Sequence, residues 1–275
     1  MALTDKIKAI ADAIRAKTGS TDTMTLAEMP SAISGIQSGG GDEELITALK
    51  VAYEGVPEDG VLIIPEGITS IRAYGWAYCD DLLRVEGSSG ITIINEFAFR
   101  SAYNLETAEF RDGLLSIGQH AFANCTNLTN VILPDSVEVI DTQAFYQCSR
   151  LTLSMLPKNL ITLGMNALYG CNNASIHSLP DKLEVISENS LRRIIAADHL
   201  TIPASVKSIG GWALADSASM IGVTFLGTPT SLDDKTFGNS NTVIITINVP
   251  WAEGEVANAP WGATNATINY NYTGE

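Results

Sequence analysis

A large apolar side chain returns every 23 residues along about two thirds of this chain, without an insertion or a deletion. A second column of isoleucine or leucine runs five residues ahead of it and keeps the same step. A fixed period of this length is typical of stacked supersecondary units that are each too small to bury an apolar face alone. We therefore predict a repeat solenoid over residues 61–247. The first column is Trp76, Phe99, Phe122, Phe145, Leu168, Leu191, Leu214 and Phe237, and the second is Ile71, Ile94, Ile117, Ile140, Leu163, Ile186, Ile209 and Leu232.

The segment from Leu128 to Cys148 shows how one repeat is built. Its opening L-x-x-V-x-L alternates at period two, which favours a short strand with Val131 and Leu133 pointing inward. Pro134 then ends the strand, because proline cannot donate a hydrogen bond to a sheet. The V-x-x-I and A-F residues that follow have spacings of three and four, which fit short strands or helical turns. We therefore predict parallel strands joined by short turns or helical segments.

This repeat, L-x-x-V-x-L-P-x-S-V-x-x-I-x-x-x-A-F-x-x-C, closely resembles the BspA-type leucine-rich repeat. The resemblance covers roughly two thirds of the chain and implies a right-handed solenoid lined by strands. It is specific for the fold and uninformative about function, because such solenoids mainly supply an extended surface.

Composition excludes several classes of partner. The net charge of −15 argues against nucleic acid, which favours a basic face. No window approaches the ~20 consecutive apolar residues of a membrane span, so we expect no membrane insertion. The first residues, MALTDKIKAIADAIRAKTG, mix charged and apolar side chains, and we therefore expect no secretory signal peptide.

The sequence carries none of the common catalytic or cofactor-binding motifs, so we predict a protein that is not an enzyme and has no cofactor. Four cysteines invite a zinc or disulfide interpretation, but all four occupy one column of the 23-residue frame. A column along a stack does not converge on a tetrahedral ion. We predict buried free thiols, with a disulfide between adjacent coils as the alternative. The cysteines are Cys79, Cys125, Cys148 and Cys171.

Residues 1–37 are predicted to form a helical module for attachment or oligomerisation, with a helix over residues 4–17. Its apolar residues have a 4-3-4 spacing, which predicts a narrow seam that packs on the next helix or between chains. A Gly-rich linker at 38–41, a capping helix at 42–60 and a C-terminal cap at 248–275 complete the predicted organisation. The seam residues are Leu3, Ile7, Ile10 and Ile14.

Two repeats depart from the strand pattern. The inward strand position carries Ser154 and His177 in these repeats, where the neighbouring Leu153 and Ile176 are apolar instead. A shift of one residue reverses which side chain faces the core. We therefore predict a local bulge that turns Ser154 and His177 outward.

Two sets of side chains are candidates for binding a partner. Tyr74, Phe97 and Trp212 share the variable column just before the Ala-Phe pair, and further aromatic residues, Trp251 and Trp261 among them, cluster in the tail. Such rings either contact sugars and proteins or pack in the core and cap. The second set comprises strand positions, namely Asn130, His199 and Thr201.

Both flanks of the repeat carry a further resemblance. The stretches LTDKIKAIADAIRAKTG and MTLAEMPSAISGI look like the N-terminal module of many tail-associated structural proteins of phages and prophages, and VPWAEGEVANAPWGATNATINYNY is similar to the ends of the same proteins. The resemblance implies a homotrimeric virion component at the tail tip or fibre, which attaches to other tail proteins and touches a host-surface glycan or protein. The alternatives are a bacterial surface adhesin or protein-binding module, and a depolymerase of surface glycans.

Overall fold

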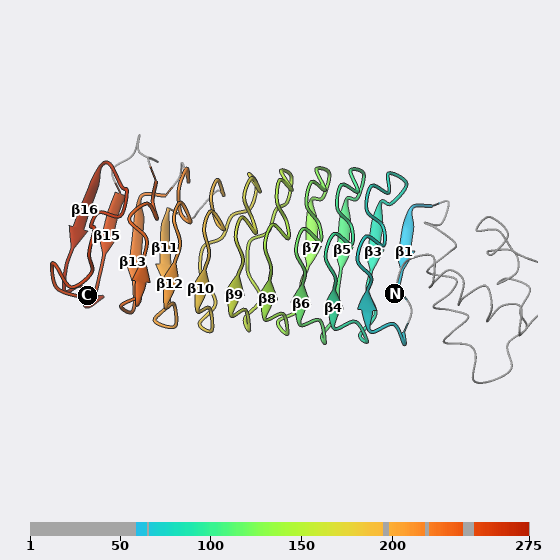
Figure 1. Cartoon of the computed structure of the whole chain (residues 1–275), viewed down its shortest axis with the longest axis horizontal. Coiled ribbons are helices and arrows are strands. Elements are labelled where there is room, and N and C mark those ends of the chain that lie inside the picture. Colours follow the sequence, from blue (N-terminus) through green and yellow to red (C-terminus); the bar gives the residue numbers. More distant parts are fainter. Residues whose placement is uncertain (1–58, 65, 195–197, 218–219, 239–244, 275) are drawn as a thin grey trace, which may run out of the picture. The chain divides into compact units, whose positions relative to one another are not determined.

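The computed structural model describes residues 59–64, 66–194, 198–217, 220–238 and 245–274. Within these ranges the chain winds into a solenoid whose strands stack side by side from β1 to β16 (Figure 1). These residues contain strands and turns and no helix, so of the two predicted alternatives inside the repeat the turns are confirmed and the helical segments are wrong. The predicted N-terminal module with its seam, the Gly-rich linker and nearly all of the capping helix lie outside the described residues.

Three sheets cover two sides of the solenoid, and every strand pairs parallel with its neighbours. The first sheet is β1 (Val61–Ile63), β3 (Arg84–Glu86), β5 (Thr107–Glu109) and β7 (Asn130–Ile132). The third is β11 (His199–Ile202), β13 (Gly222–Phe225), β15 (Ile245–Asn248) and β16 (Ala266–Asn269). The second is β2 (Ser70–Ile71), β4 (Ile93–Ile94), β6 (Ser116–Ile117), β8 (Val139–Ile140), β9 (Thr162–Leu163), β10 (Val185–Ile186), β12 (Ser208–Ile209) and β14 (Ser231–Leu232).

Sheet register reproduces the sequence period. Leu62 pairs with Val85, Val85 with Ala108 and Ala108 with Val131, each 23 residues on. Because the coils of the first two sheets all have this length, identical columns meet between coils, and the alternation of strand side chains buries one column and exposes the next. Only the last two steps of the third sheet differ, with 24 residues from β13 to β15 and 21 from β15 to β16. The constant period is therefore the direct cause of the in-register parallel stack.

The remaining side of the solenoid, which we call the turn face, consists of residues 73–78 and their equivalents in later repeats up to residues 211–216. Two residues per repeat, such as Tyr74 and Tyr78, adopt left-handed backbone angles with φ of 57° and 60°. The N–H groups of Tyr74, Trp76 and Tyr78 donate to carbonyls of the next coil over 3.2, 2.8 and 2.7 Å. The turns thus hydrogen-bond from coil to coil as the strands do.

The core is a ladder of stacked rings. Phe99 and Phe122 lie 5.0 Å apart between ring centroids, and Phe122 and Phe145 lie 5.2 Å apart, with all three side chains fully buried. Stacked rings at this separation add to the free energy gained by burying their surface. The first column of the sequence is therefore the central column of the core.

The cysteines are free thiols, as predicted, with three buried and Cys79 half-buried. The Sγ atoms of Cys125, Cys148 and Cys171 each donate to a phenylalanine carbonyl at 3.0–3.1 Å. Burial raises the pKa of the Cys171 thiol to about 12. The Cys171 thiol therefore stays protonated at neutral pH, and all three buried thiols serve as hydrogen-bond donors to the backbone.

The first and third sheets are separated where the sequence departs from the strand pattern. Leu153 and Ile176 are buried, whereas Ser154 and His177 are exposed, which confirms the predicted outward turn of both side chains. Instead of a bulge within a continuous sheet, the described residues between β7 and β11 form no strand on this side. A hollow of about 240 Å³ lies at the break.

The C-terminal residues close this side of the stack. β16 adds to the third sheet beside β15, where Ile268 pairs with Ile247. Trp251 and Trp261 are buried and pack edge-to-face at 6.0 Å, with Phe225 5.2 Å from Trp251. Of the two interpretations of these tryptophans, cap packing is therefore the one that the structure supports.

Candidate functional site

The first part of the turn face carries a stack of partly exposed rings. Tyr74 and Phe97 lie 4.7 Å apart between centroids, and Phe97 and His120 lie 4.8 Å apart, with 12° between the ring planes in both pairs. Each ring is supplied by a separate repeat at the left-handed position that precedes the Ala-Phe pair. The 23-residue register therefore converts one variable column into a continuous stack.

Arg100 joins this stack from the same coil as Phe97. Its guanidinium carbon lies 5.4 Å from the Phe97 centroid and 6.0 Å from that of Tyr78, within the range of cation–π attraction. The Nε atom is buried and has no hydrogen-bond partner. Within the described residues Arg100 forms no ion pair, so the rings hold a guanidinium that no carboxylate neutralises.

A second stack follows on the next four repeats. Tyr146 and Tyr169 are 5.5 Å apart with an 11° angle, and the Arg192 guanidinium lies 5.6 Å from Tyr169 and 5.0 Å from Trp212. Along the stack the four side chains are, in order, two aromatic rings, a cation and a third aromatic ring. This order lets the cation contact an aromatic ring on each side of it.

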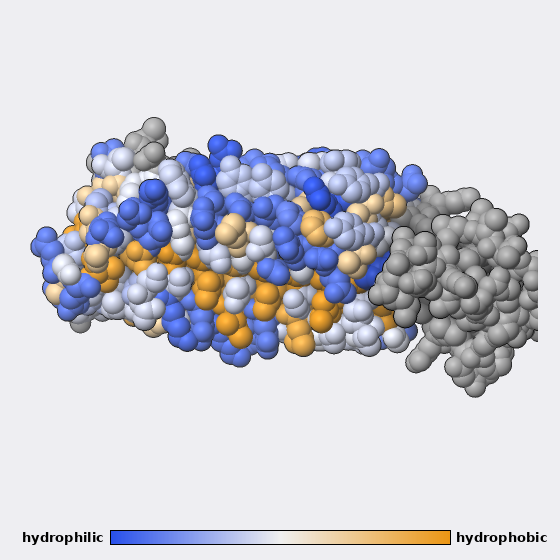
Figure 2. All heavy atoms as spheres, in the orientation of Figure 1, coloured by the Kyte–Doolittle hydropathy of each residue, from blue (hydrophilic) through white to orange (hydrophobic). Residues whose placement is uncertain are grey.

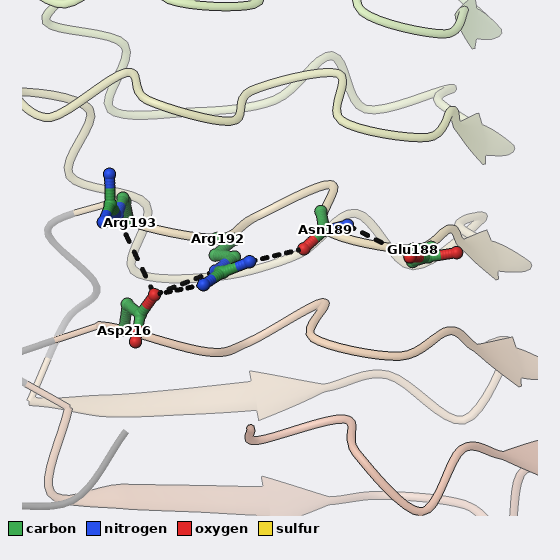
Figure 3. Close-up of polar contacts among 5 residues, drawn as sticks. All are labelled: Glu188, Asn189, Arg192, Arg193 and Asp216. Atoms are coloured by element: carbon green, nitrogen blue, oxygen red, sulfur yellow. Dashed lines mark hydrogen bonds and ion pairs between the residues drawn. The ribbon is translucent and has the colours of Figure 1, made fainter. Parts of the chain in front are cut away.

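A polar network fixes this second cation, as Figure 3 shows. Arg192 pairs with Asp216 at 2.8 Å and donates to the Asn189 amide oxygen at 3.1 Å, and Arg193 approaches the same carboxylate at 3.8 Å. Asn189 in turn donates to Glu188 at 3.3 Å. Since Arg192 and Asp216 are both partly buried, this pair is better shielded from solvent than the exposed pair of Lys158 and Asp135.

The structure brings some of the predicted binding residues together and separates others. Tyr74 and Phe97 stack directly, whereas Trp212 belongs to the second stack. Asn130 is exposed on β7, and His199 and Thr201 are exposed on β11, across the break between the sheets. The predicted strand residues therefore do not form one site, and the predicted seam lies outside the described residues.

Several residues of the two stacks are absent from the sequence-based candidates. His120 stands 23 residues after Phe97, so the frame itself was enough to find it. The others occupy the column three residues later, which also holds alanines and does not suggest a contact surface. These residues are Arg100, Tyr146, Tyr169 and Arg192.

Partial burial and the Arg100 guanidinium lower the pKa of His120 from its ordinary value near 6.5. As pH falls through about 6.5, the unfolded chain therefore binds the proton before the folded chain does, and stability decreases. We expect the urea midpoint to fall between pH 7.5 and pH 5.5, and to fall less in His120→Gln, since Gln143 fills the same column one coil later. Equal decreases in the two proteins would contradict this assignment.

The rest of the described surface shows no centre for metal chemistry. No group of three or more His, Cys, Asp or Glu side chains in the described ranges is arranged to hold a metal ion. Nor does a search of the same residues find a helix long and apolar enough to cross a bilayer. Figure 2 shows a largely hydrophilic surface crossed by a hydrophobic band that follows the stacked coils. Exposed apolar side chains near the second sheet include Ile93 and Leu115.

Parallel strands in register, one coil per 23 residues and a side-chain ladder on the outside define a repeat solenoid. The model of the BspA type Leucine rich repeat region matches residues 60–173 and 116–244, in six copies. Because these matches cover more than half of the chain, the protein belongs to the BspA-type leucine-rich repeat family. No curated protein matches it significantly.

Among solved structures, the leucine-rich repeat protein TpLRR of T. pallidum is similar, with 22% identity and a TM-score of 0.52 over 61% of this chain and 78% of that one. This likeness shows the fold. A leucine-rich repeat protein of Bacteroides ovatus has 17% identity and a TM-score of 0.42 over 76% and 68% of the two chains. A leucine rich cell surface protein of Faecalibacterium prausnitzii has 19% identity and a TM-score of 0.37 over 78% and 79%.

Proposed function

We propose that this protein is a non-catalytic recognition protein that binds a glycan or protein on a host cell surface through its turn face. One observation carries the proposal: seven successive repeats each place an aromatic or arginine side chain in the two stacks. Aromatic residues and arginine are the types that dominate binding energy at protein surfaces. Coils about 4.8 Å apart give the row a length of roughly 29 Å, enough for an extended partner. The row is Tyr74, Phe97, His120, Tyr146, Tyr169, Arg192 and Trp212.

Stacking determines what this row offers a partner. Within each stack the faces of the inner rings are covered by their neighbours, so the groups that remain are ring edges, tyrosine hydroxyls and guanidinium N–H groups. Ring edges carry partial positive charge, and the hydroxyls and N–H groups donate hydrogen bonds. The row therefore suits a partner rich in hydrogen-bond acceptors, and it suits sugar rings that lie flat on an aromatic face less well.

The setting that we propose is the tail of a phage or prophage particle. The support is the resemblance of residues 3–36 and 249–272 to the two ends of tail-associated structural proteins. In this setting the N-terminal residues attach the chain to other tail proteins and form a trimer through Leu3, Ile7, Ile10 and Ile14. Antibody labelling of purified virions tests this: label on cell-surface fractions and none on virions would favour a bacterial adhesin.

The turn-face proposal is tested with an array of bacterial surface glycans. Tyr169→Ala, which removes the ring between Tyr146 and Arg192, is expected to weaken binding to the glycans that the wild-type protein retains by tenfold or more. Thr201→Ala on β11 is the control on the strand face and is expected to leave binding unchanged.

Two results would contradict the proposal. If Thr201→Ala lost binding and Tyr169→Ala did not, the strand face would be the binding surface. If the bound glycan were shortened and products were released, the protein would be a depolymerase, which the proposal excludes. Circular dichroism of each variant establishes that the solenoid is intact before binding is compared.

A further inference from the structure

Arg100 is the cation of the turn face that lacks an ionic partner. Arg192 occupies the equivalent position four repeats later, also lies against aromatic rings, and pairs with Asp216 at 2.8 Å. Among the described residues Arg100 has no such carboxylate. Since buried polar atoms are ordinarily hydrogen-bonded, the buried Arg100 Nε without a partner, in a guanidinium without a counter-charge, requires an explanation.

The neighbouring columns leave the Arg100 head group open. Ala77 and Ala123 occupy its column in the two adjacent coils, so no long side chain lies directly above or below it. Tyr78, whose ring lies 6.0 Å from the guanidinium, is 59% exposed, and Tyr74, which stacks on Phe97, is 56% exposed. A ligand that reaches the guanidinium therefore also meets the Tyr78 side chain, which can donate a hydrogen bond.

The charge of the surrounding stack favours an anion at this point. Phe97 and Tyr78 hold the guanidinium against their rings, and stacked rings turn their positive edges outward. The fork of N–H donors on a guanidinium matches a carboxylate or a phosphate and binds both in the same geometry. A neutral partner would leave the cation uncompensated.

We propose that Arg100, with Tyr78, binds a single carboxylate or phosphate group on an otherwise neutral glycan. This inference rests on the proposed function and names the chemical class of its ligand. The net charge of −15 limits the density of negative charge on that ligand, because a polyanion would be repelled by the rest of the surface. A glycan with one acidic group per repeating unit offers an anion to Arg100 and keeps the density of negative charge low.

Three sugars that differ at one carbon test the proposal: glucose, glucuronate and glucose 6-phosphate. Dissociation constants are measured by NMR titration of the full-length protein. At least one of the two anionic sugars is expected to bind tenfold or more tightly than glucose, and the tighter one identifies carboxylate or phosphate as the recognised group. Equal affinity for all three sugars, or no binding of either anionic sugar, would overturn the proposal.

Arg100→Gln is expected to abolish the preference for the anionic sugar. Arg150→Gln is the matched control, because it removes the same charge from an exposed corner where Arg150 donates to Asn127. If both variants lost the preference equally, the cause would be net charge and the site would be wrong. If Arg100→Gln shifts the denaturation midpoint, Arg100→Lys is used in its place. Lysine keeps the positive charge but lacks the forked N–H donors of the guanidinium, so the preference for the anionic sugar is expected to be reduced. A preference as large as that of the wild-type protein would contradict the proposed site.

The glycan array separates the failure of this site from the failure of the proposed function. If Tyr169→Ala weakens array binding and Arg100→Gln does not, the turn face binds glycans and the anion site is wrong. If neither variant affects array binding, the turn face is not the binding surface and both inferences fall.

Discussion

Phe122→Ala is expected to lower the free energy of unfolding by about 3–5 kcal/mol. The Phe122 ring is fully buried, stacks on Phe99 and Phe145, and meets the edge of Phe110 at 6.1 Å. Hydrogen bonds on three sides fix the spacing between this coil and its two neighbours, so the neighbouring coils cannot move in to fill the cavity. The cost is therefore the lost burial plus most of the cavity term. Urea denaturation followed by circular dichroism measures it.

Two variants bracket this result. Leu115→Ala removes a side chain that is 44% exposed and is expected to change stability by no more than about 0.5 kcal/mol. Phe122→Leu is expected to cost clearly less than Phe122→Ala, because Leu168, Leu191 and Leu214 fill the same column in later coils. Similar midpoints for Phe122→Ala and Leu115→Ala would mean that the ring ladder does not hold the coils together.

The period alone predicted the solenoid, its parallel register and its core, because a constant step brings identical columns together in space. It did not predict the absence of helix from the described repeats. In the coil of Phe145, for example, Ile140 ends a two-residue strand, and Ala144 and Phe145 lie in turns. The apolar residues of this segment are nevertheless spaced three to four residues apart, as they are on one face of a helix. Spacing cannot distinguish these conformations when each segment is this short.

The candidate site was predictable only in part. Column membership alone was enough to connect Tyr74 with Phe97. The position of Arg100 depends on left-handed backbone angles at Tyr78 and Phe97, and these residue types give no sign of positive φ in a sequence. Likewise, the separation of Asn130 from His199 follows from the break between two sheets, which is a property of the whole stack.

Gly164→Ala is expected to destabilise the protein by about 3 kcal/mol, near the upper end for overpacking. A β-carbon at Gly164 would lie 2.5 Å from backbone atoms of Asp141 and Thr142 in the preceding coil. Backbone in a hydrogen-bonded stack cannot move aside as a flexible side chain can. Gly118 and Gly210 make similarly close approaches, so this column alternates glycine with polar residues that take the space between coils.

Gly75→Ala makes the same chemical change with the opposite expectation. The later coils carry Ala98, Ala121, Ala144, Ala167, Ser190 and Ala213 at this position. A β-carbon at Gly75 would lie 3.1 Å from Cγ of the flexible Arg72 side chain, which can move aside, and 3.2 Å from the Arg72 carbonyl oxygen. A side chain therefore fits there, and the lower entropy of the unfolded chain is expected to raise stability by about 0.4–1 kcal/mol. Both expectations are tested by measuring the urea midpoints of the two variants under the same conditions. A loss in Gly75→Ala as large as that in Gly164→Ala would show that both glycines are needed for backbone freedom, and that the close approach between coils at Gly164 is not the cause.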